Sequence, residues 1–231
     1  MCPRIIPRVM STFPLQLRDG HLFVELNGEL WLLDTGAPTS FGTSNNLSLA
    51  SEQCRLGTSY LGLTAATLTS FIGVPCVGLL GADVLGRFDH ILDAANGTIT
   101  ISTAELAHTG QTVRLAEFMG IPILTAQIVG ADYRMFFDTG AQISYFQDDS
   151  LANFPSAGSV TDFYPGVGQF QTDTHQVPLT LAGVAFTLRC GMLPGLLGAT
   201  LMMADTEGIV GNQILCNRIV GYFPRRRALV L

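Results

Sequence analysis

The sequence contains no lysine. Its basic side chains are 12 arginines, against 18 aspartates and glutamates, and the formal net charge is −6. A protein that binds nucleic acid in general needs a basic surface, so this class is excluded and we expect no nucleic-acid partner. The only basic run is the arginine triplet at residues 225–227, which we interpret as a solvated turn rather than a patch that docks a partner.

Charged residues of either sign are also scarce, at 13%, whereas hydrophobic residues make up 48%. Disordered chains have the opposite composition, so a folded protein is expected. The most apolar late stretch, residues 191–204, is too short to cross a bilayer and contains a proline and three glycines. The first residues, M-C-P-R-I-I-P-R-V-M, contain no apolar run of signal-peptide length. We therefore expect a cytoplasmic protein with no membrane partner.

Cysteine and histidine lack the spacings of a metal site. The five cysteines are odd in number and have no C-x-x-C spacing, and the four histidines stand alone. Reduced thiols therefore fit better than a disulfide framework or a zinc site, and we expect neither a metal nor a cofactor. Each histidine is interpreted as a packed or surface side chain. The residues concerned are Cys2, Cys54, Cys76, Cys190, Cys216, His21, His90, His108 and His175.

The chain contains an internal repeat. Residues 22–42 and 124–146 each hold a β-like run, a glycine-containing turn, an apolar run and then D-T-G-A-x-x-S. A second shared motif, two hydrophobic residues followed by glycine, stands at 79–81 and 209–211, and from there an offset of 130 residues holds to the last residue. The repeat predicts two lobes of one design.

These motifs set the expected domain organisation. We predict a flexible N-terminus at residues 1–11, a first lobe at 12–101, a polar linker at 102–112 and a second lobe at 113–231. The offset between the repeats grows by 26 residues inside the span 145–207, which predicts an insertion in the second lobe.

Short alternating runs, broken by glycine, proline and asparagine, predict an all-β protein. Asn-Gly pairs at 27–28 and 96–97 indicate type I′ hairpin turns. Helical turns are expected at three places: residues 48–56, 82–87 and 149–154. The apolar stretch at 193–203 is interpreted as a loop, and it is either part of the second lobe's core or an exposed wall of a cleft or partner surface.

Two aspartates follow apolar runs, W-L-L before Asp34 and M-F-F before Asp138. A carboxylate at the end of a buried strand is costly to place unless it has partners, and a pseudo-twofold axis would bring these two together. Two close carboxylates cannot both ionise readily, so they hold one proton between them. One can then act as a base on water while the other polarises a carbonyl. The alternative, two unrelated Asp-Gly turns, is less favoured.

The neighbours of the two aspartates have expected roles of their own. Thr35 and Thr139 are predicted to join the two loops by hydroxyl-to-backbone hydrogen bonds across the axis. Gly36 and Gly140 are predicted to allow the tight backbone there.

Together these motifs resemble those of the aspartic proteases, and in particular the retropepsin-like branch, in which D-T-G-A replaces D-T-G-S. The hydrophobic-hydrophobic-glycine motifs match the second hallmark of that family. The resemblance covers both lobes and implies a bilobed acid-protease fold with two pseudo-twofold-related β lobes and the active site between them. It implies an aspartic endopeptidase with Asp34 and Asp138 as the catalytic pair. Retroviral members supply one lobe per subunit, whereas this chain holds both, so a monomer is expected.

The resemblance does not decide which segment covers the cleft. Pepsin-like enzymes carry a tyrosine on a first-lobe flap, and Tyr60 is the only tyrosine in that region, although its context differs. Retropepsin flaps have glycine-rich tips, and here P-G-V-G, with Gly166 and Gly168, lies in the second lobe. The second lobe therefore either supplies the flap or holds an ordinary long hairpin.

Two functions remain open. The chain is either an endopeptidase acting on a peptide or protein substrate, or a non-catalytic retropepsin-like module for peptide binding or assembly.

Overall fold

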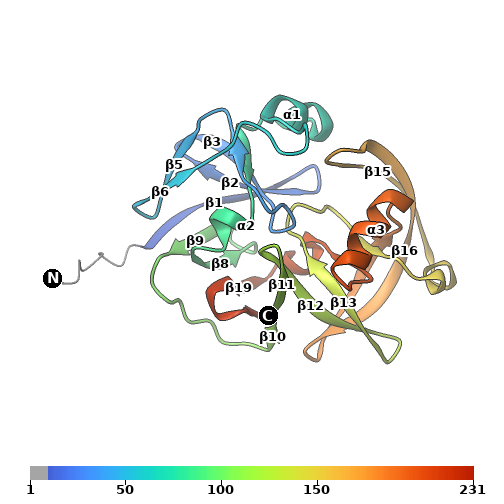
Figure 1. The fold of residues 1–231 in the computed structure, drawn as a ribbon. Helices are drawn as coiled ribbons and strands as arrows, with labels where there is room; N and C mark the ends of the chain where they lie inside the picture. Colours follow the sequence, from blue (N-terminus) through green and yellow to red (C-terminus); the bar gives the residue numbers. More distant parts are fainter. Residues whose placement is uncertain (1–9) are drawn as a thin grey trace.

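Strands make up most of the structure, in keeping with the short alternating runs of the sequence. The computed structural model describes residues 10–231, which hold one ten-stranded sheet, one eight-stranded sheet and a separate two-stranded hairpin. Figure 1 shows the two lobes, with the first half of the chain in one and most of the second half in the other. Within residues 10–231 no helix is long and apolar enough to cross a membrane.

The ten-stranded sheet has the order β10-β20-β19-β8-β9-β1-β2-β3-β7-β4. Its strands from the first lobe are β1 (Met10–Arg18), β2 (His21–Leu26), β3 (Glu29–Leu33), β4 (Phe41–Gly42), β7 (Gly78–Leu80), β8 (Asp89–Asp93) and β9 (Thr98–Ser102). Those from later in the chain are β10 (Thr112–Arg114), β19 (Ile219–Phe223) and β20 (Ala228–Val230). Met10 and Ser11, placed in the flexible N-terminus by the sequence, are part of β1 and pair with β9. Residues 1–9 lie outside the described residues.

The eight-stranded sheet belongs to the second lobe and has the order β11-β12-β13-β18-β14-β17-β16-β15. Its strands are β11 (Ala116–Phe118), β12 (Ile121–Ile128), β13 (Ala131–Phe137), β14 (Ser144–Phe146), β15 (Ser156–Tyr164), β16 (Gly168–Leu181), β17 (Val184–Gly191) and β18 (Gly208–Val210). The long hairpin β15–β16 lies in the span where the sequence predicts an insertion.

The C-terminal parts of the two repeats meet in the ten-stranded sheet. Adding the offset of 130 to the bounds of β8 gives the bounds of β19, and the same offset carries Thr98, the start of β9, to Ala228, the start of β20. Strand β8 pairs with β19 in antiparallel register, with Ile91 opposite Gly221. These two residues are equivalent in the repeat, so the pseudo-twofold axis passes between them. The lobes are therefore joined through continuous β-sheet.

Residues 48–56, expected as a helical turn, instead form a hairpin of β5 (Asn46–Leu49) and β6 (Glu52–Arg55), so that prediction is wrong. Burial along this segment alternates with the period of a strand, and Leu49 and Cys54 point inward. Ala50 and Ser51 have positive φ values of 45° and 65° and make the turn. The other two expected turns are helical, as α2 (Ala82–Leu85) and the 3-10 helix η1 (Asp149–Asn153). Two further 3-10 turns are η2 (Asn212–Leu215) and η3 (Pro224–Arg226).

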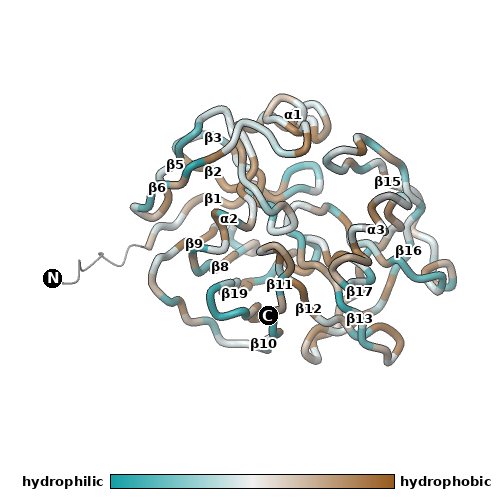
Figure 2. Tube along the Cα trace, viewed as in Figure 1, coloured by the Kyte–Doolittle hydropathy of each residue, from teal (hydrophilic) through white to brown (hydrophobic). Residues whose placement is uncertain are grey.

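Two helices were not expected from the sequence. Helix α1 (Ala65–Ile72) begins after Thr64, which forms a capping box with Thr67. Its threonines and isoleucine lower helix propensity, which hides the helix in a single sequence. Helix α3 (Gly195–Met203) begins after Pro194 with no side-chain cap. It replaces the loop expected at 193–203, and the tube of Figure 2 is largely hydrophobic along it.

The two predicted Asn-Gly turns differ. Asn27 and Gly28 have φ values of 54° and 83°, as a type I′ turn requires, and they join β2 to β3. At the second site only Gly97 has a positive φ, of 67°, so the type I′ prediction there is wrong although the β8–β9 hairpin exists. That turn is longer, and the carboxylate of Asp93 accepts a hydrogen bond from the backbone N–H of Asn96 at 2.9 Å.

The arginine triplet lies exposed on and directly after η3, as the predicted solvated turn, and two of its members also form ion pairs with a buried partner. Arg225 and Arg226 both donate hydrogen bonds to the carboxylate of Asp89, which is fully buried. They also donate to carbonyls within the predicted linker, at residues 103–106. A buried carboxylate requires such cationic partners, and Asp89 is 136 residues away from Arg225 in the chain. The C-terminal turn thus binds the linker to the first lobe.

Candidate active site

Each candidate aspartate directly follows a strand of one lobe. Asp34 comes after β3 and Asp138 after β13, and each of these strands pairs in parallel with the strand of a hydrophobic-hydrophobic-glycine motif. The backbone N–H of Asp34 donates to the carbonyl of Leu80 at 3.0 Å, and that of Asp138 donates to the carbonyl of Val210 at 3.0 Å. The second motif therefore holds the backbone at each aspartate.

Thr35 and Thr139 connect the two loops by reciprocal hydrogen bonds. The backbone N–H of Thr35 donates to Oγ1 of Thr139 at 3.1 Å, and the backbone N–H of Thr139 donates to Oγ1 of Thr35 at 3.0 Å. Each hydroxyl in turn donates to a carbonyl of the opposite lobe, Phe137 at 2.7 Å and Leu33 at 2.8 Å. Both threonines are buried. The arrangement is the one expected from the sequence.

Gly36 and Gly140 let each loop approach the opposite aspartate. A Cβ atom added to Gly36 would lie 2.3 Å from Cγ of Asp138, and one added to Gly140 would lie 2.5 Å from Cγ of Asp34. Both distances are far below van der Waals contact, so a side chain at either position would displace a carboxyl group. The two carboxyl groups therefore lie side by side across the axis, each against the other lobe's glycine.

The two carboxyl groups accept hydrogen bonds from equivalent backbone positions of their own loops. Asp34 accepts backbone hydrogen bonds from Ala37, at 2.8 Å, and from Gly36, and Asp138 accepts them from Gly140 at 2.8 Å and Ala141 at 3.2 Å. Burial, and then the charge of Asp138, raise the pKa of Asp34 well above its usual value. Burial also raises the pKa of Asp138, but the hydrogen bonds that it accepts act in the opposite direction. The two carboxyl groups therefore form a coupled pair that holds one proton between them.

Two serines of the repeated motif support the loops, a role that the sequence analysis did not assign. The backbone N–H of Gly81 donates to Oγ of Ser40 at 2.8 Å, and that of Gly211 donates to Oγ of Ser144 at 3.0 Å. These serines end the D-T-G-A-x-x-S pattern. Their recurrence at the same spacing in both repeats is the sequence feature from which this role could have been predicted.

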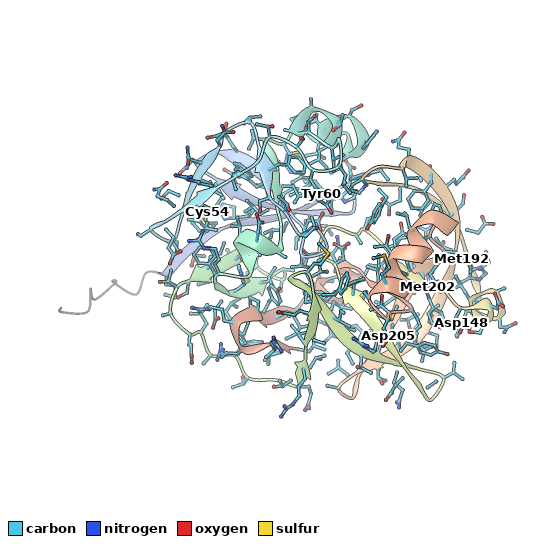
Figure 3. The ribbon with its side chains drawn as sticks, in the orientation of Figure 1. Cys54, Tyr60, Asp148, Met192, Met202 and Asp205 are labelled. Atoms are coloured by element: carbon cyan, nitrogen blue, oxygen red, sulfur yellow. The ribbon has the colours of Figure 1, made fainter. Side chains whose placement is uncertain are left out.

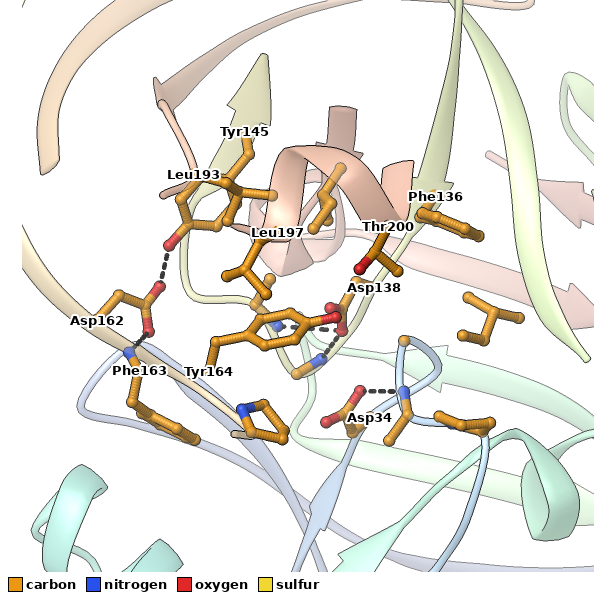
Figure 4. A pocket seen from close by; sticks show the side chains of 18 of the residues that line it. Asp34, Phe136, Asp138, Tyr145, Asp162, Phe163, Tyr164, Leu193, Leu197 and Thr200 are labelled. Carbon is orange, nitrogen blue, oxygen red and sulfur yellow. Dashed lines mark hydrogen bonds between the residues drawn. The ribbon is translucent and has the colours of Figure 1, made fainter. Parts of the chain in front are cut away.

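A cleft of about 150 Å³ surrounds the two aspartates and is lined by both lobes (Figure 4). Its walls are mostly apolar. The first lobe contributes Leu32, Ala37, Pro38, Tyr60 and Leu63, and the second lobe contributes mainly Phe136, Phe163, Tyr164, Leu193, Leu197, Leu201 and Ile209. Ligand pockets are usually about 300–1,000 Å³, so this cleft is small for a ligand site.

The hairpin β15–β16 of the second lobe covers the cleft. Gly166 and Gly168, with φ values of 79° and 85°, form its tip, and neither lines the cleft. Side chains alternate along β15. Phe163 therefore packs against a hydrophobic cluster of the first lobe, whereas Tyr164 packs against one of the second lobe. The hairpin is thus held on both sides.

Tyr60 and Tyr164 approach the aspartates from opposite lobes. Tyr60, the predicted flap residue, lies on the first-lobe side of the cleft (Figure 3), and burial and then the charge of Asp34 raise its pKa. Burial, and then the charges of Asp138 and Asp34, raise the pKa of Tyr164. Tyr164 was not predicted as a residue of the site, although this tyrosine directly precedes the P-G-V-G segment.

His21 was also missed as a residue of the site. Its ring is buried, and Nδ1 lies 3.0 Å from the carbonyl oxygen of Gly140. Because a carbonyl oxygen only accepts hydrogen bonds, Nδ1 carries the proton and donates it. Its ring centroid lies 5.8 Å from that of Phe163, which in turn lies 5.3 Å from that of Phe71 on α1. His21 therefore joins the loop of Asp138 to the hairpin above it. An isolated histidine carries no sequence signal for this position.

Residues 193–203 were expected to be either part of the second lobe's core or an exposed wall of a cleft or partner surface, and most of them form helix α3. Leu197 and Leu201 belong to a hydrophobic cluster of the second lobe and also line the cleft. Met202 and Met203, at the end of the helix, are 81% and 77% exposed. The segment is therefore both a core element and a wall of the cleft.

Within residues 10–231, no group of three or more histidine, cysteine, aspartate or glutamate side chains is placed to hold a metal. Cys54, Cys76, Cys190 and Cys216 are free thiols, and Cys2 lies outside the described residues.

Two solved structures are similar in fold. The crystal structure of basic 7S globulin from soybean is 12% identical with a TM-score of 0.51, and the match covers 96% of this chain and 94% of the globulin. The aspartic proteinase from Irpex lacteus is 11% identical with a TM-score of 0.49, covering 95% of this chain and 96% of the proteinase. No family model and no curated protein matches the sequence.

At 12% identity, the similarity to basic 7S globulin shows the fold alone and says nothing of the chemistry at the cleft. The strand content, the two large sheets and the full-length match agree with the architecture expected from the repeats. The chain therefore has the all-β, bilobed, pepsin-like fold of the acid proteases.

Proposed function

We propose that the chain is an aspartic endopeptidase, and that Asp34 and Asp138 activate the water that cleaves the peptide bond. One observation carries the proposal. Two half-buried carboxyl groups, one from each lobe, share a hydrogen bond in one cleft, and the pKa of each is raised, so the pair is suited to hold a single proton. A pair in this state supplies an acid and a base at neutral or mildly acidic pH.

The proposed reaction is an addition of water followed by elimination of the amine. Asp138 takes a proton from the water while the water oxygen attacks the scissile carbonyl carbon, and Asp34 gives its proton to the carbonyl oxygen. The tetrahedral intermediate then loses the amine, which receives the proton held by Asp138. A hydroxyl proton of the intermediate returns to Asp34, and the pair is restored with one proton.

The small volume of the cleft limits how a substrate can enter. An extended peptide pairs with a strand edge through its backbone, and the hairpin β15–β16 offers such an edge over the aspartates. About 150 Å³ does not hold several residues of a peptide. We therefore propose that the hairpin lifts from the first lobe, with loss of the Phe163–Phe71 ring contact, before substrate binds.

The test is cleavage of an unfolded protein substrate across a series of pH values. Asp34→Asn and Asp138→Asn are expected to lower kcat by about 10³-fold or more, because Asn keeps the shape but removes one carboxyl of the pair. Glu29→Gln, on β3 at an exposed position, is the matched control for loss of one negative charge. Full activity in either Asn variant would overturn the proposed chemistry.

A peptide-binding module without catalysis is the second candidate. The observation that favours it is the fold shared with a protein named as a globulin. Binding of a pepstatin-type peptide without cleavage of any substrate would support it. We also propose that both lobes of one site come from a single cytoplasmic chain, so sedimentation should show an active species of the monomer mass of 24.7 kDa.

A further inference from the structure

A third carboxylate lines the cleft besides the two candidate catalytic groups. Asp162 stands on β15, two residues before Tyr164, and only 6% of its surface is exposed. Figure 4 shows it on the second-lobe side, near Tyr145 and Leu193, with the ring of Tyr164 between it and Asp138 in that view.

The partners of Asp162 are all uncharged. Its Oδ1 atom accepts a hydrogen bond from the backbone N–H of Phe163 at 2.8 Å, and its Oδ2 atom accepts one from the hydroxyl of Tyr145. The arginines of residues 10–231 form five ion pairs with other carboxylates and none with Asp162. A buried carboxylate is costly unless a cation compensates it, as Arg225 and Arg226 do for Asp89.

The rest of the cleft also lacks a compensating cation. Its titratable lining consists of Asp34, Asp138, Asp162, three tyrosines and His21, with no arginine. The chain contains no lysine that could serve instead. The cleft is therefore an acidic site inside largely apolar walls, and its electrostatic complement is a positive charge on the ligand.

The position of Asp162 relates it to the reacting bond. Side chains two apart on a strand point to the same face, so Asp162 and Tyr164 share the face that turns toward the second lobe. They are separated by about 7 Å along the strand, which is the span of two residues of a paired peptide. A substrate side chain at Asp162 thus belongs to a residue within about two positions of the bond above the aspartates.

The surroundings of Asp162 suit a long basic side chain. Phe170, Leu193 and Leu197 line the cleft on the same side and offer apolar contact. Lysine and arginine bury their aliphatic stems in such contact while their charged ends meet a polar group. We propose that Asp162 is a specificity-determining residue, which binds a Lys or Arg side chain of the peptide close to the scissile bond. The inference rests on the proposed endopeptidase function.

The alternative is that Asp162 serves only to hold the hairpin to the second lobe through Tyr145. Two variants separate these roles. Asp162→Asn removes the charge and keeps a carbonyl oxygen that accepts the Tyr145 hydroxyl, whereas Tyr145→Phe removes that hydrogen bond and keeps the charge. Asp173→Asn removes one charge from an exposed position on the adjacent strand β16 and is the matched control.

The experiment compares peptides of one apolar sequence that carry Lys, Met or Glu at each position in turn. The wild-type protein and Asp173→Asn are expected to prefer Lys over Met by about 10-fold or more in kcat/KM at one position within two residues of the cut. Asp162→Asn should lose this ratio, and Tyr145→Phe should retain it. Circular dichroism checks the fold of each variant.

Three results would overturn the inference: no Lys preference in the wild type, an unchanged ratio in Asp162→Asn, or loss of the ratio only in Tyr145→Phe. The same peptides are also measured for binding by fluorescence anisotropy. If nothing is cleaved but Lys peptides bind more tightly than Met peptides, and Asp162→Asn removes the difference, the endopeptidase proposal fails while Asp162 keeps its role. If cleavage occurs without a Lys preference, the inference about Asp162 fails alone.

Discussion

The imidazole of His90 stacks on the ring of Tyr222, with their centroids 5.5 Å apart and their planes at 21°. The two residues are opposite partners of β8 and β19, where the lobes meet. Nε2 of His90 donates to the carbonyl of Leu85 at 2.8 Å, and burial lowers the pKa of this histidine from 6.5 to about 4. The neutral ring is therefore part of the contact between the lobes. Two charged groups also act on the pKa of His90: the charge of Asp89 raises it and that of Arg225 lowers it.

This lowered pKa predicts a loss of stability in acid. Between about pH 6.5 and pH 4 the unfolded chain binds a proton at His90 that the folded chain does not bind, so the free energy of unfolding falls as the pH falls. The shift corresponds to about 3 kcal/mol. The raised pKa values of Asp34 and Asp138 act with the opposite sign, because the folded state holds their proton more tightly.

Denaturant unfolding of wild type and His90→Gln at several pH values separates the two effects, since the aspartates are common to both proteins. The difference in the free energy of unfolding should shrink as the pH falls from 6.5 to 4. A difference that does not change with pH would show that His90 titrates normally. His108→Gln, at a partly exposed position, is the control.

Removing one hydroxyl of the interlobe contact should destabilise the protein. Thr35→Val leaves two buried groups without partners, the N–H of Thr139 and the carbonyl of Phe137. We expect a loss of about 2–4 kcal/mol in the free energy of unfolding. Thr35→Ser keeps the hydroxyl and should recover most of it. Equal losses in the two variants would mean that the methyl group, and not the hydrogen bonds, carries the effect.

The pH profile of kcat/KM should lie above that of an ordinary carboxyl pair. In the proposed mechanism the active state has one proton on the pair of Asp34 and Asp138, and the pKa of each is raised. Both limbs of the bell therefore move to higher pH, and the centre is expected near roughly pH 5–6. An optimum below about pH 3.5 would contradict the assignment.

A hydroxyl beside the pair should reverse part of this shift. Ala141 follows the loop of Asp138 and donates only its backbone N–H to that carboxylate. In Ala141→Ser a hydroxyl that donates to the carboxylate favours the charged form, so the acidic limb should move to lower pH. Ala131→Ser, at an exposed position at the start of β13, should leave the profile unchanged. An acidic limb that moves up in Ala141→Ser would exclude this explanation.

The hairpin tyrosine should matter more for activity than the first-lobe tyrosine. The charges of both Asp138 and Asp34 raise the pKa of Tyr164, whereas of these two only the charge of Asp34 raises that of Tyr60. Tyr164→Phe keeps the ring packing and removes a hydroxyl near the reacting atoms, so kcat/KM should fall by about 10-fold, the value of one hydrogen bond. Tyr60→Phe is the matched variant from the other lobe. A larger loss in Tyr60→Phe would show that the first lobe supplies the functional tyrosine.

The parts of the site that could be predicted from the sequence are those encoded by local, repeated segments. Asp34, Thr35 and Gly36 recur as Asp138, Thr139 and Gly140, and a twofold relation between equal segments is enough to bring them together. The insertion in the second lobe could likewise be located from the offsets. Its use as the cover of the cleft stayed one of two alternatives, because a glycine-rich tip does not show where a hairpin lies.

The parts that could not be predicted depend on contacts between distant segments. Asp89 and Arg225 are 136 residues apart, and neither residue alone indicates the other. His21 and Asp162 have no repeated counterpart that marks them, and their positions follow from the paths of β1–β2 and β15. Helix α3 was missed because an apolar segment that meets both the core and a cleft has no polar face to give it a helical period.

The hairpin β15–β16 has a consequence for how a peptide is oriented. A site made of two identical halves presents the same surface to a chain running in either direction, so it cannot distinguish the two polarities of a substrate. Here one side of the aspartates is closed by a strand hairpin and α3, and the other by Tyr60 and the segment before α1. The two ends of the cleft are chemically different. If the proposed function is correct, we therefore expect a peptide substrate to bind in one preferred N-to-C direction, fixed by the lobe from which the hairpin comes.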